Sequence, residues 1–353
     1  MPRSSHLSPA SAAPWATART LVNVVVTAGL AYALYRQFFV VNDLPSLYVG
    51  FRQNLPAGFV YYILAAIALM PLNLLLEAYK LRVTLPPNLR APWLETLGQV
   101  CAGLTVGLWT PGRLGEFAGR MTRTRVAQRG PMVAATALGG MAQWAPLLIG
   151  GGAAVLFWRK LNSPTAGTAE GLATYLTSDA LQWGGGISVV LGVASAVAVW
   201  YAPSVVKAVL KRSVPAVLRG LSGHLGLDAL VRPDFLRAVE RQRGGLLLAS
   251  VGRYLVYLTQ MSLAFVAFGL PTSVGAAIAG TAALLLLHGF LPVPPALQAV
   301  ARIEFALLLF AYSDPNEVSI AAASLFVFVL NLGSPALAGW LFILRRNDLS
   351  LSP

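Results

Sequence analysis

The chain has 353 residues, with a hydrophobic fraction of 56%, a charged fraction of 11% and a formal net charge of +13. So apolar a composition, against ~45–50% in soluble domains, excludes an ordinary water-soluble globular protein. In a membrane protein the basic excess reflects cytoplasmic loops, so we expect no nucleic-acid partner. A single cysteine, Cys101, and three scattered histidines exclude a disulfide framework and a histidine metal site, and no cofactor is expected.

Six segments approach the ~20 apolar residues that cross a bilayer as a helix. They are residues 20–41, 58–76, 131–158, 187–202, 246–268 and 318–343. We therefore predict an all-α polytopic membrane protein with about six full spans. The membrane domain is expected to cover residues 20–345, between short tails at 1–19 and 346–353. We expect the first span to stay uncleaved, because apolar residues continue past a signal-like Ala31-Tyr32-Ala33 triplet.

The distribution of basic residues predicts the orientation of the chain, because cytoplasmic loops are enriched in Lys and Arg. Most of the 26 basic residues fall in both tails and in three segments, 77–97, 111–130 and the predicted loop 203–245. The segments left for the other side hold only Arg36, Arg52, Arg159 and Lys160. We therefore expect cytoplasmic N- and C-termini in an inner, multi-pass cell membrane protein.

A short apolar stretch, residues 97–110, lies between two of these basic segments. A single crossing would place one basic flank on the wrong side, and the stretch is shorter than a full span. We therefore predict a re-entrant helical hairpin that enters from the cytoplasm and turns near Thr110-Pro111-Gly112. The alternative is a set of eight ordinary spans, several of them short.

A second interruption, LPVPPALQAVARIEF, follows the apolar residues 274–291, and its flanks are poor in basic residues. This pattern predicts a second hairpin that enters from the outside. The halves 58–158 and 246–343 then form an inverted repeat. Paired interrupted segments in such halves indicate a transport site near the middle of the membrane.

The stretch WTPGRLGEFAGR supplies the first candidate site. Thr110 is suited to cap a helix whose first residue is Pro111, and the free amides at such a helix end attract anions. Gly112 and Gly115 allow a close approach of backbone or ligand. On this helix, Arg113, Glu116 and Arg120 would share one face. A charged side chain inside a membrane is a candidate for function by default.

Arg302 and Glu304 lie in the returning arm of the second hairpin, two residues apart, and are further substrate-binding candidates. If the hairpin tips meet, crossed pairs are conceivable, Arg113 with Glu304 and Arg302 with Glu116. A local structural ion pair is the alternative. Arg253 and His288 are secondary candidates. For Arg253 we favour a side chain that extends to the cytoplasmic surface over one that lines a lipid path.

PGRLGEFAGR after a short apolar run, with a later Pro-rich segment containing Arg-x-Glu, resembles the lysylphosphatidylglycerol synthase transmembrane region, or flippase-like domain family. The resemblance covers roughly residues 20–345. The first motif matches at Pro111, Gly112, Arg113, Gly115, Glu116 and Arg120. The second departs from the family's Pro-Gly-Gly-x-Gly-x-Arg-Glu pattern, since Ala296 and Gln298 replace glycines and Ile303 separates Arg302 from Glu304.

The resemblance implies an inner-membrane protein that moves an anionic, aminoacylated or polyprenyl-linked lipid between leaflets. Its expected partners are a phospholipid or polyprenyl lipid and a separate lipid-modifying enzyme, because the aminoacyltransferase domain of bifunctional relatives has no counterpart here. We therefore expect a transporter and not an enzyme. Two alternatives stay open. One is a membrane enzyme with Glu116 or Glu304 as general base, and the other is a noncatalytic scaffold for lipid synthesis.

Overall fold

The computed structural model describes residues 55–122, 128–161, 179–211, 233–291, 294–310 and 316–344, with residues 32, 49, 52, 53 and 124. Every regular element in these residues is helical. The elements are α3 (Phe59–Thr84), η2 (Pro87–Leu89), α4 (Trp93–Gly107), η3 (Pro111–Arg113), α5 (Gly115–Arg120), α6 (Arg129–Leu161), α8 (Asp179–Lys211), α10 (Pro233–Ala267), α11 (Val274–Gly289), α12 (Pro295–Phe310), α13 (Glu317–Phe328), η7 (Val329–Gly333) and α14 (Ser334–Leu344). The π turn η7 joins α13 and α14 into one helix.

Several helix ends follow from local sequence chemistry. α3 ends just before Pro86 and Pro87, which lack the amide hydrogen that would continue the helix. Ser273 caps α11 by accepting a hydrogen bond from a first-turn amide, and Asn316 caps α13 by accepting two. These short polar residues therefore mark where two apolar helices begin.

Five helical segments are long and apolar enough to cross a membrane. They are Phe59–Thr84, Arg129–Phe157, Gln182–Ser204, Pro233–Ala267 and Glu317–Leu344. They coincide with five of the six predicted spans, so the prediction of a helical, multi-pass membrane protein is confirmed. The remaining predicted span, residues 20–41 apart from residue 32, and the two predicted tails lie outside the described residues.

The helices extend beyond the predicted segments at several ends. α3 continues to Thr84, past the predicted end at residue 76. The segment 203–245, expected to be a loop, is helical at both ends, because α8 runs to Lys211 and α10 begins at Pro233. Polar residues in these extensions obscured the helices, since hydropathy alone reports only the apolar part of a helix.

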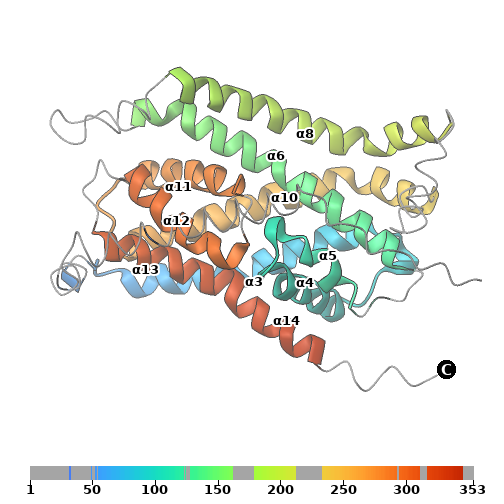
Figure 1. The fold of residues 1–353 in the computed structure, drawn as a ribbon, viewed down its shortest axis with the longest axis horizontal. Coiled ribbons are helices and arrows are strands. Elements are labelled where there is room, and N and C mark those ends of the chain that lie inside the picture. The colour runs from blue at the N-terminus through green and yellow to red at the C-terminus, as the bar shows by residue number, and fades with distance from the viewer. Residues whose placement is uncertain are drawn as a thin grey trace, which may run out of the picture.

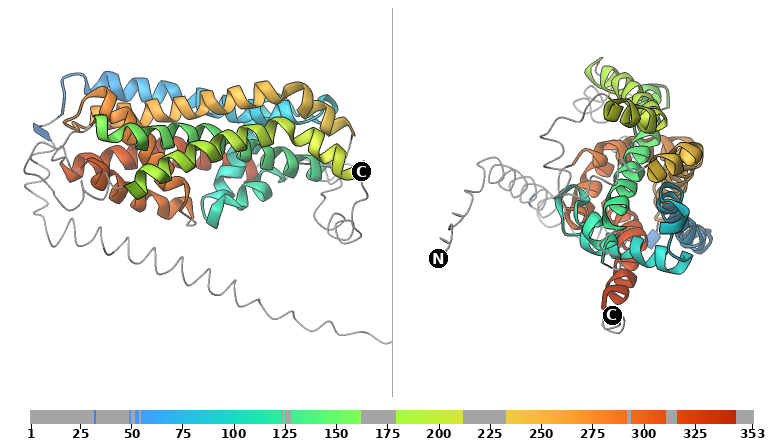
Figure 2. Two further views of the ribbon diagram at one scale, coloured as in Figure 1. Left: turned by 90° about the horizontal axis from the view of Figure 1, so that it is seen from above. Right: turned by 90° about the vertical axis from the view of Figure 1, so that its right-hand side faces the viewer.

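The long helices run side by side along the longest dimension of the molecule (Figures 1 and 2). α3 packs along α10, and α6 packs along α8. Gln260 on α10 donates a hydrogen bond from its side-chain amide to the carbonyl of Ala66 on α3, at 2.9 Å. Asn73 on α3 donates to the side-chain oxygen of Asn331 in the π turn, at 2.7 Å. Such amide contacts join helices in membrane proteins.

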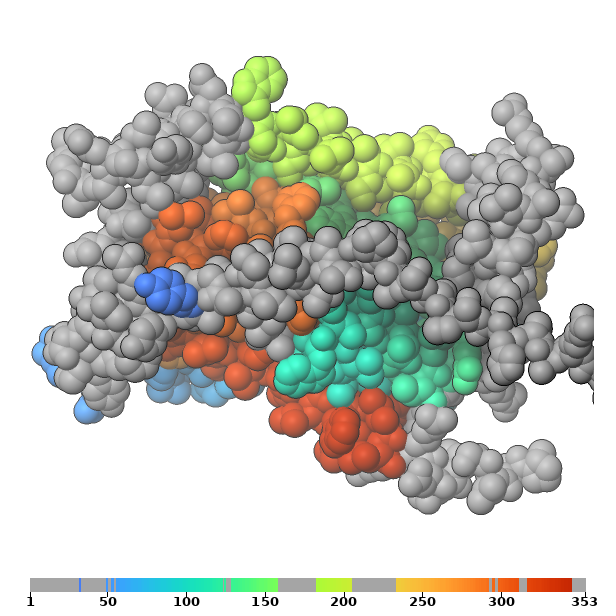
Figure 3. Space-filling model, viewed as in Figure 1, coloured from blue at the N-terminus to red at the C-terminus, as the bar shows by residue number. Residues whose placement is uncertain are grey.

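Two pairs of short helices lie toward opposite ends of this long axis (Figure 1). α4 and α5 form the first pair, and α11 and α12 form the second. The first pair packs against α14, and Figure 3 shows this contact where the teal surface of the pair meets the red surface of α14. In the second pair, α11 packs against α6. Each short pair therefore packs against a long helix from the other half of the chain.

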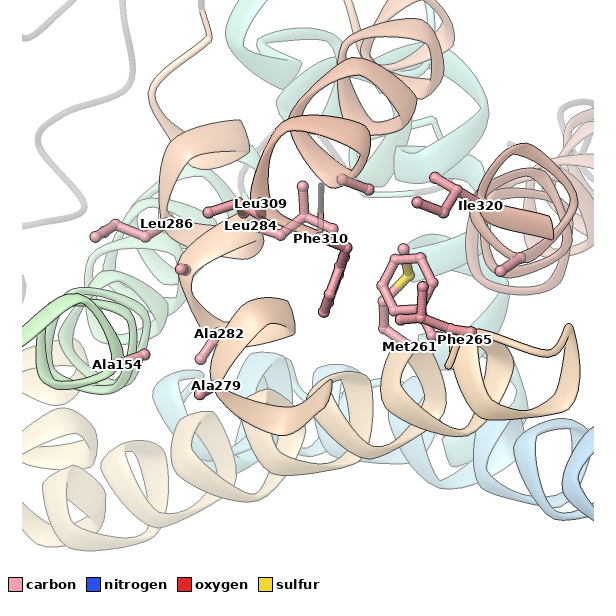
Figure 4. Close-up of a cluster of buried hydrophobic side chains, with 14 of the residues drawn as sticks. Ala154, Met261, Phe265, Ala279, Ala282, Leu284, Leu286, Leu309, Phe310 and Ile320 are labelled. Carbon is pink, nitrogen blue, oxygen red and sulfur yellow. The ribbon is translucent and has the colours of Figure 1, made fainter. Parts of the chain in front are cut away.

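The largest apolar core surrounds the second short pair (Figure 4). Phe265 on α10 and Phe310 on α12 are almost fully buried, with ring centroids 5.0 Å apart. Ile320 on α13 and Leu284 on α11 complete this core, and both are 0% exposed. A second core joins α3, α4, α6 and the start of α10. The two cores hold the short pairs against the long helices, and the charged residues of the site described below lie on both.

Candidate functional site

The first short pair is held together by glycines facing each other across a close helix contact. α4 carries Gly103 and Gly107, and α5 carries Gly115 and Gly119, with the same four-residue spacing in each helix. A Cβ placed on Gly119 would lie 2.2 Å from the carbonyl oxygen of Ala102, closer than two such atoms can approach. Small residues at this spacing let membrane helices pack backbone to backbone.

Gly119→Ala is expected to destabilise the protein by about 1–3 kcal/mol, because the added methyl overpacks the α4–α5 contact. Gly140 on α6 provides the control, since nothing lies within 4 Å of its Cβ position. There, Ala should be neutral or stabilising by up to about 1 kcal/mol, through helix propensity. Thermal unfolding in detergent measures both variants, and equal midpoints would contradict the close packing.

The turn between α4 and α5 has a conformation that differs from the prediction. Gly112 and Arg113 both have a φ of +60°, in the left-handed region, and Arg113 lies in the turn η3 and not in a helix. Thr110 accepts a hydrogen bond from the amide of Gly115 at 2.7 Å, so it satisfies a donor at the start of α5. α5 has six residues. The prediction of a helix that begins at Pro111 after a Thr110 cap is therefore wrong, because α5 begins only at Gly115.

Arg113 and Glu116 nevertheless lie together at this turn. The Arg113 guanidinium forms an ion pair with Glu116 Oε1 at 2.5 Å, and its side chain is 38% exposed. A non-glycine residue in the left-handed region costs roughly 1–2 kcal/mol, so packing holds Arg113 in this position against a local strain. The conceived crossed pair of Arg113 with Glu304 is absent among the described contacts.

Glu77 on α3 is the centre of a buried network of charged side chains. Its Oε1 accepts a hydrogen bond from Arg120 at 2.7 Å. Its Oε2 lies 3.1 Å from Lys80 Nζ and 3.4 Å from Arg253 Nε, the latter an ion pair without hydrogen-bond alignment. Arg120 also reaches Glu116 Oε2 at 3.2 Å. We call Glu77, Lys80, Arg113, Glu116, Arg120 and Arg253 the Glu77 network.

Gln143 on α6 anchors this network to a third long helix. Its side-chain oxygen accepts a hydrogen bond from Lys80 at 3.1 Å and a longer one from Arg253 at 3.5 Å. Gln143 lies midway along the membrane-spanning segment Arg129–Phe157. The expectation that Arg253 extends to the cytoplasmic surface is wrong, because its guanidinium turns inward to Glu77 and Gln143.

The Glu77 network carries more positive than negative charge. Its cations are Lys80, Arg113, Arg120 and Arg253, and its anions are Glu77 and Glu116. Lys80 and Arg120 are almost completely buried, with side chains 2% and 4% exposed. A buried charge is costly unless an opposite charge or hydrogen bonds compensate it, so the uncompensated excess is unusual for a structural network.

Arg302 on α12 is the third buried cation of the described residues, after Lys80 and Arg120, and the least satisfied of the three. The residue is 4% exposed, and its Nε and one terminal nitrogen have no hydrogen-bond partner in the described part of the chain. Its other terminal nitrogen lies 3.3 Å from His288 Nε2 on α11, and the guanidinium lies 6.0 Å from the Tyr257 ring centroid. We call Arg302, His288 and Tyr257 the Arg302 site.

Glu304 does not belong to this site. It lies two residues after Arg302 on α12, and such residues point to different sides of a helix. Its Oε1 is buried without a hydrogen-bond partner in the described residues. No carboxylate of the described residues is paired with Arg302. The crossed pair of Arg302 with Glu116, which we considered from the sequence, is therefore absent. The alternative, a local ion pair between Arg302 and Glu304, is absent as well.

The Glu77 network and the Arg302 site adjoin. The turn Pro111–Arg113 contacts α12, and His288 lies within electrostatic reach of both Arg302 and Arg113. Phe290 packs on Trp144, the residue after Gln143, with ring centroids 5.5 Å apart. The end of α11 is therefore level with the middle of α6, where the Glu77 network is anchored. The turn between α4 and α5 therefore contacts α12, but neither of the crossed ion pairs forms among the described residues.

Sequence reasoning missed Glu77, Lys80 and Gln143. The first two lie beyond the apolar part of α3, in a segment that we assigned to the cytoplasm on its charge. The available signal was their spacing of three residues, which places them on one helix face and allows one to partly neutralise the other. Gln143 gives no signal by itself, since isolated amides are common in membrane helices.

A polar cavity of about 300 Å³ lies beside the outer end of the first short pair. Arg90 and Glu95 face it, together with the buried residues Gln99 on α4 and Thr124. It provides room for a polar group close to the ends of α3 and α4.

No group of three or more His, Cys, Asp or Glu residues in the described segments is arranged to hold a metal ion. Comparisons with models of protein families, with curated proteins and with solved structures find no match.

Proposed function

We propose that the protein is a flippase-like transporter that moves an anionic lipid head group between the leaflets of the inner membrane. The observation that carries this proposal is the excess of buried guanidinium groups where the two short helix pairs meet. Buried ionisable residues inside membrane proteins mark the pathways of substrates and ions. The acyl chains would stay in the bilayer while the head group crosses between the halves, as the resemblance to the flippase-like family also implies.

Helix lengths favour re-entrant hairpins for both short pairs. α4 has 15 residues, and α11 and α12 have 16 each. At 1.5 Å per residue these helices reach roughly 22–24 Å, short of the ~30 Å hydrocarbon core. In each pair, the chain enters the first helix and leaves the second at the same end of the bundle. The two pairs lie at opposite ends (Figure 1).

The packing partners of the hairpins favour an inverted repeat. α3 and α10, the first spans of the two halves, pack on each other, α4 packs on α14 in the second half, and α11 packs on α6 in the first. Exchanging the two halves therefore reproduces the same set of contacts. Repeats of this kind place substrate sites at their interface near the membrane middle.

Two cation–π pairs support a cytoplasmic assignment for one end of the bundle. The Arg82 guanidinium lies 4.5 Å from the Trp93 ring centroid, and Arg243 lies 4.1 Å from that of Trp200. Trp at the interface and an excess of Arg on the cytoplasmic side are both typical of membrane proteins. With this assignment, the loop after α3 and the region after α8 face the cytoplasm.

The contacts of the arginines suggest a different role for each of them. Arg120 forms ion pairs with both Glu77 and Glu116, although its Nε has no partner in the described residues, so we assign it to holding α5 in place. Arg302 has unused donors, and Arg113 is part-exposed at the adjoining turn. Guanidinium groups bind phosphate through two parallel hydrogen bonds and stay charged when desolvated. We therefore assign the head-group contact to Arg302, assisted by Arg113.

A reconstitution experiment tests the proposal. In vesicles holding a fluorescent phosphatidylglycerol analogue, wild-type protein should expose the inner-leaflet probe to an external quencher faster than protein-free vesicles. Arg113→Ala should slow this movement at least about tenfold, as loss of a charged hydrogen bond costs about 1.5–3 kcal/mol. Arg237→Ala, at an exposed pair, should match the wild type. Wild-type vesicles no faster than empty ones would reject the proposal, and chemical turnover of the probe would favour a lipid-modifying enzyme.

A further inference from the structure

We infer that the Arg302 site takes a phosphomonoester, a phosphate group with two negative charges, in preference to a phosphodiester or a zwitterionic head group. This inference deepens the proposed function and rests on it for the lipid nature of the cargo. It arises from the hydrogen-bond donors and the net charge around Arg302.

The unused groups of the site are donors. Arg302 Nε and Nη1 are buried and have no partner in the described residues, and each can donate a hydrogen bond to a phosphate oxygen. His288 Nε2 is already engaged by Arg302. No carboxylate of the described residues forms an ion pair with Arg302, so the site offers no paired anion for the ammonium group of a zwitterionic lipid.

The charge of the surroundings indicates more than one negative charge on the ligand. The Glu77 network has four cations and two anions, and Arg302 adds a further cation beside it. Glu304 compensates one of these charges at most, from another side of α12. An excess of about two positive charges remains, and a dianion would compensate it.

Binding to the purified full-length protein in detergent tests the inference. The probes are short-chain phosphatidic acid, phosphatidylglycerol, phosphatidylethanolamine and inorganic phosphate. At pH 7.5 we expect phosphatidic acid to bind at least tenfold more tightly than phosphatidylglycerol, with phosphatidylethanolamine weaker still. Arg302→Gln should reduce the preference to less than threefold. Arg237→Gln should leave it unchanged, because Arg237 is 63% exposed and pairs only with Asp234 among the described residues.

The pH dependence supplies a second readout. A phosphomonoester has a second pKa near ~6 and carries about one charge at pH 5, whereas a phosphodiester keeps its single charge. The affinity for phosphatidic acid should therefore fall about tenfold from pH 7.5 to pH 5 and approach that for phosphatidylglycerol. Loss of this difference in Arg302→Gln would support the assignment of the dianion to this site.

The outcomes separate this inference from the proposed function. Equal binding of phosphatidic acid and phosphatidylglycerol at pH 7.5 would overturn the inference, while movement of either lipid would still support a transporter. A preference that persists in Arg302→Gln would overturn the assignment to Arg302. Inorganic phosphate that binds as tightly as phosphatidic acid would support the dianion site and contradict the lipid cargo.

Discussion

Replacing Arg302 with Gln is expected to slow head-group movement in reconstituted vesicles at least about thirtyfold, because removing one partner of a buried charged contact costs about 2–5 kcal/mol. Arg302→Lys should retain an intermediate rate, since lysine keeps the charge and loses the planar fork. The same vesicles and fluorescent lipid used for Arg113→Ala measure these rates.

The stability of the same variant separates a substrate contact from a structural role. Without a bound ligand, Arg302 is a buried cation that has no anionic partner in the described residues. Arg302→Gln should therefore leave the thermal unfolding midpoint of the ligand-free protein unchanged or raise it. A rate loss together with a lower midpoint would instead identify Arg302 as a structural residue and contradict our assignment.

Glu77→Gln is expected to have the largest effect on stability, a loss of about 3–5 kcal/mol, because it leaves buried cations without their anion. Glu77 contacts Lys80, Arg120 and Arg253, and the first two are almost completely buried. The neutral amide keeps the size of the side chain, so the effect isolates the charge. Thermal unfolding in detergent and the yield of monodisperse protein measure it.

Asp234→Asn is the matched control for this loss. Asp234 forms its ion pair with Arg237 on the same helix, but both side chains are largely exposed, 68% and 63%. Exposed pairs contribute about 0–1 kcal/mol, so the midpoint should hardly change. If Glu77→Gln proved as mild as Asp234→Asn, the Glu77 network would not hold the bundle together.

The elements that sequence reasoning found are those with strong local signals. The spans follow from long apolar runs, and the break between α4 and α5 follows from Thr110, Pro111 and Gly112. Arg113, Glu116 and Arg302 stood out because charges are rare in apolar surroundings. Each of these signals depends only on residues close together in the chain, so it can be read from a single sequence.

The partners of these charges could not be predicted in the same way. Arg120 pairs with Glu77, 43 residues earlier in the chain, and this pairing depends on how α5 packs against α3. The left-handed Arg113 and the six-residue α5 are likewise products of close glycine packing and not of helix propensity. Such long-range contacts decide which arginine is paired with carboxylates, as Arg120 is, and which has no carboxylate partner in the described residues, as Arg302 has none.

The central claim is that two interrupted segments enter the membrane from opposite faces and meet at mid-depth. Single cysteines at Asn88, Arg129 and Val274, in a Cys101→Ala background, test it by labelling with membrane-impermeant reagents in sealed vesicles. The account predicts that positions 88 and 129, on either side of the first hairpin, react from one face, and that position 274 reacts from the other. Labelling of 88 and 129 from opposite faces would contradict it.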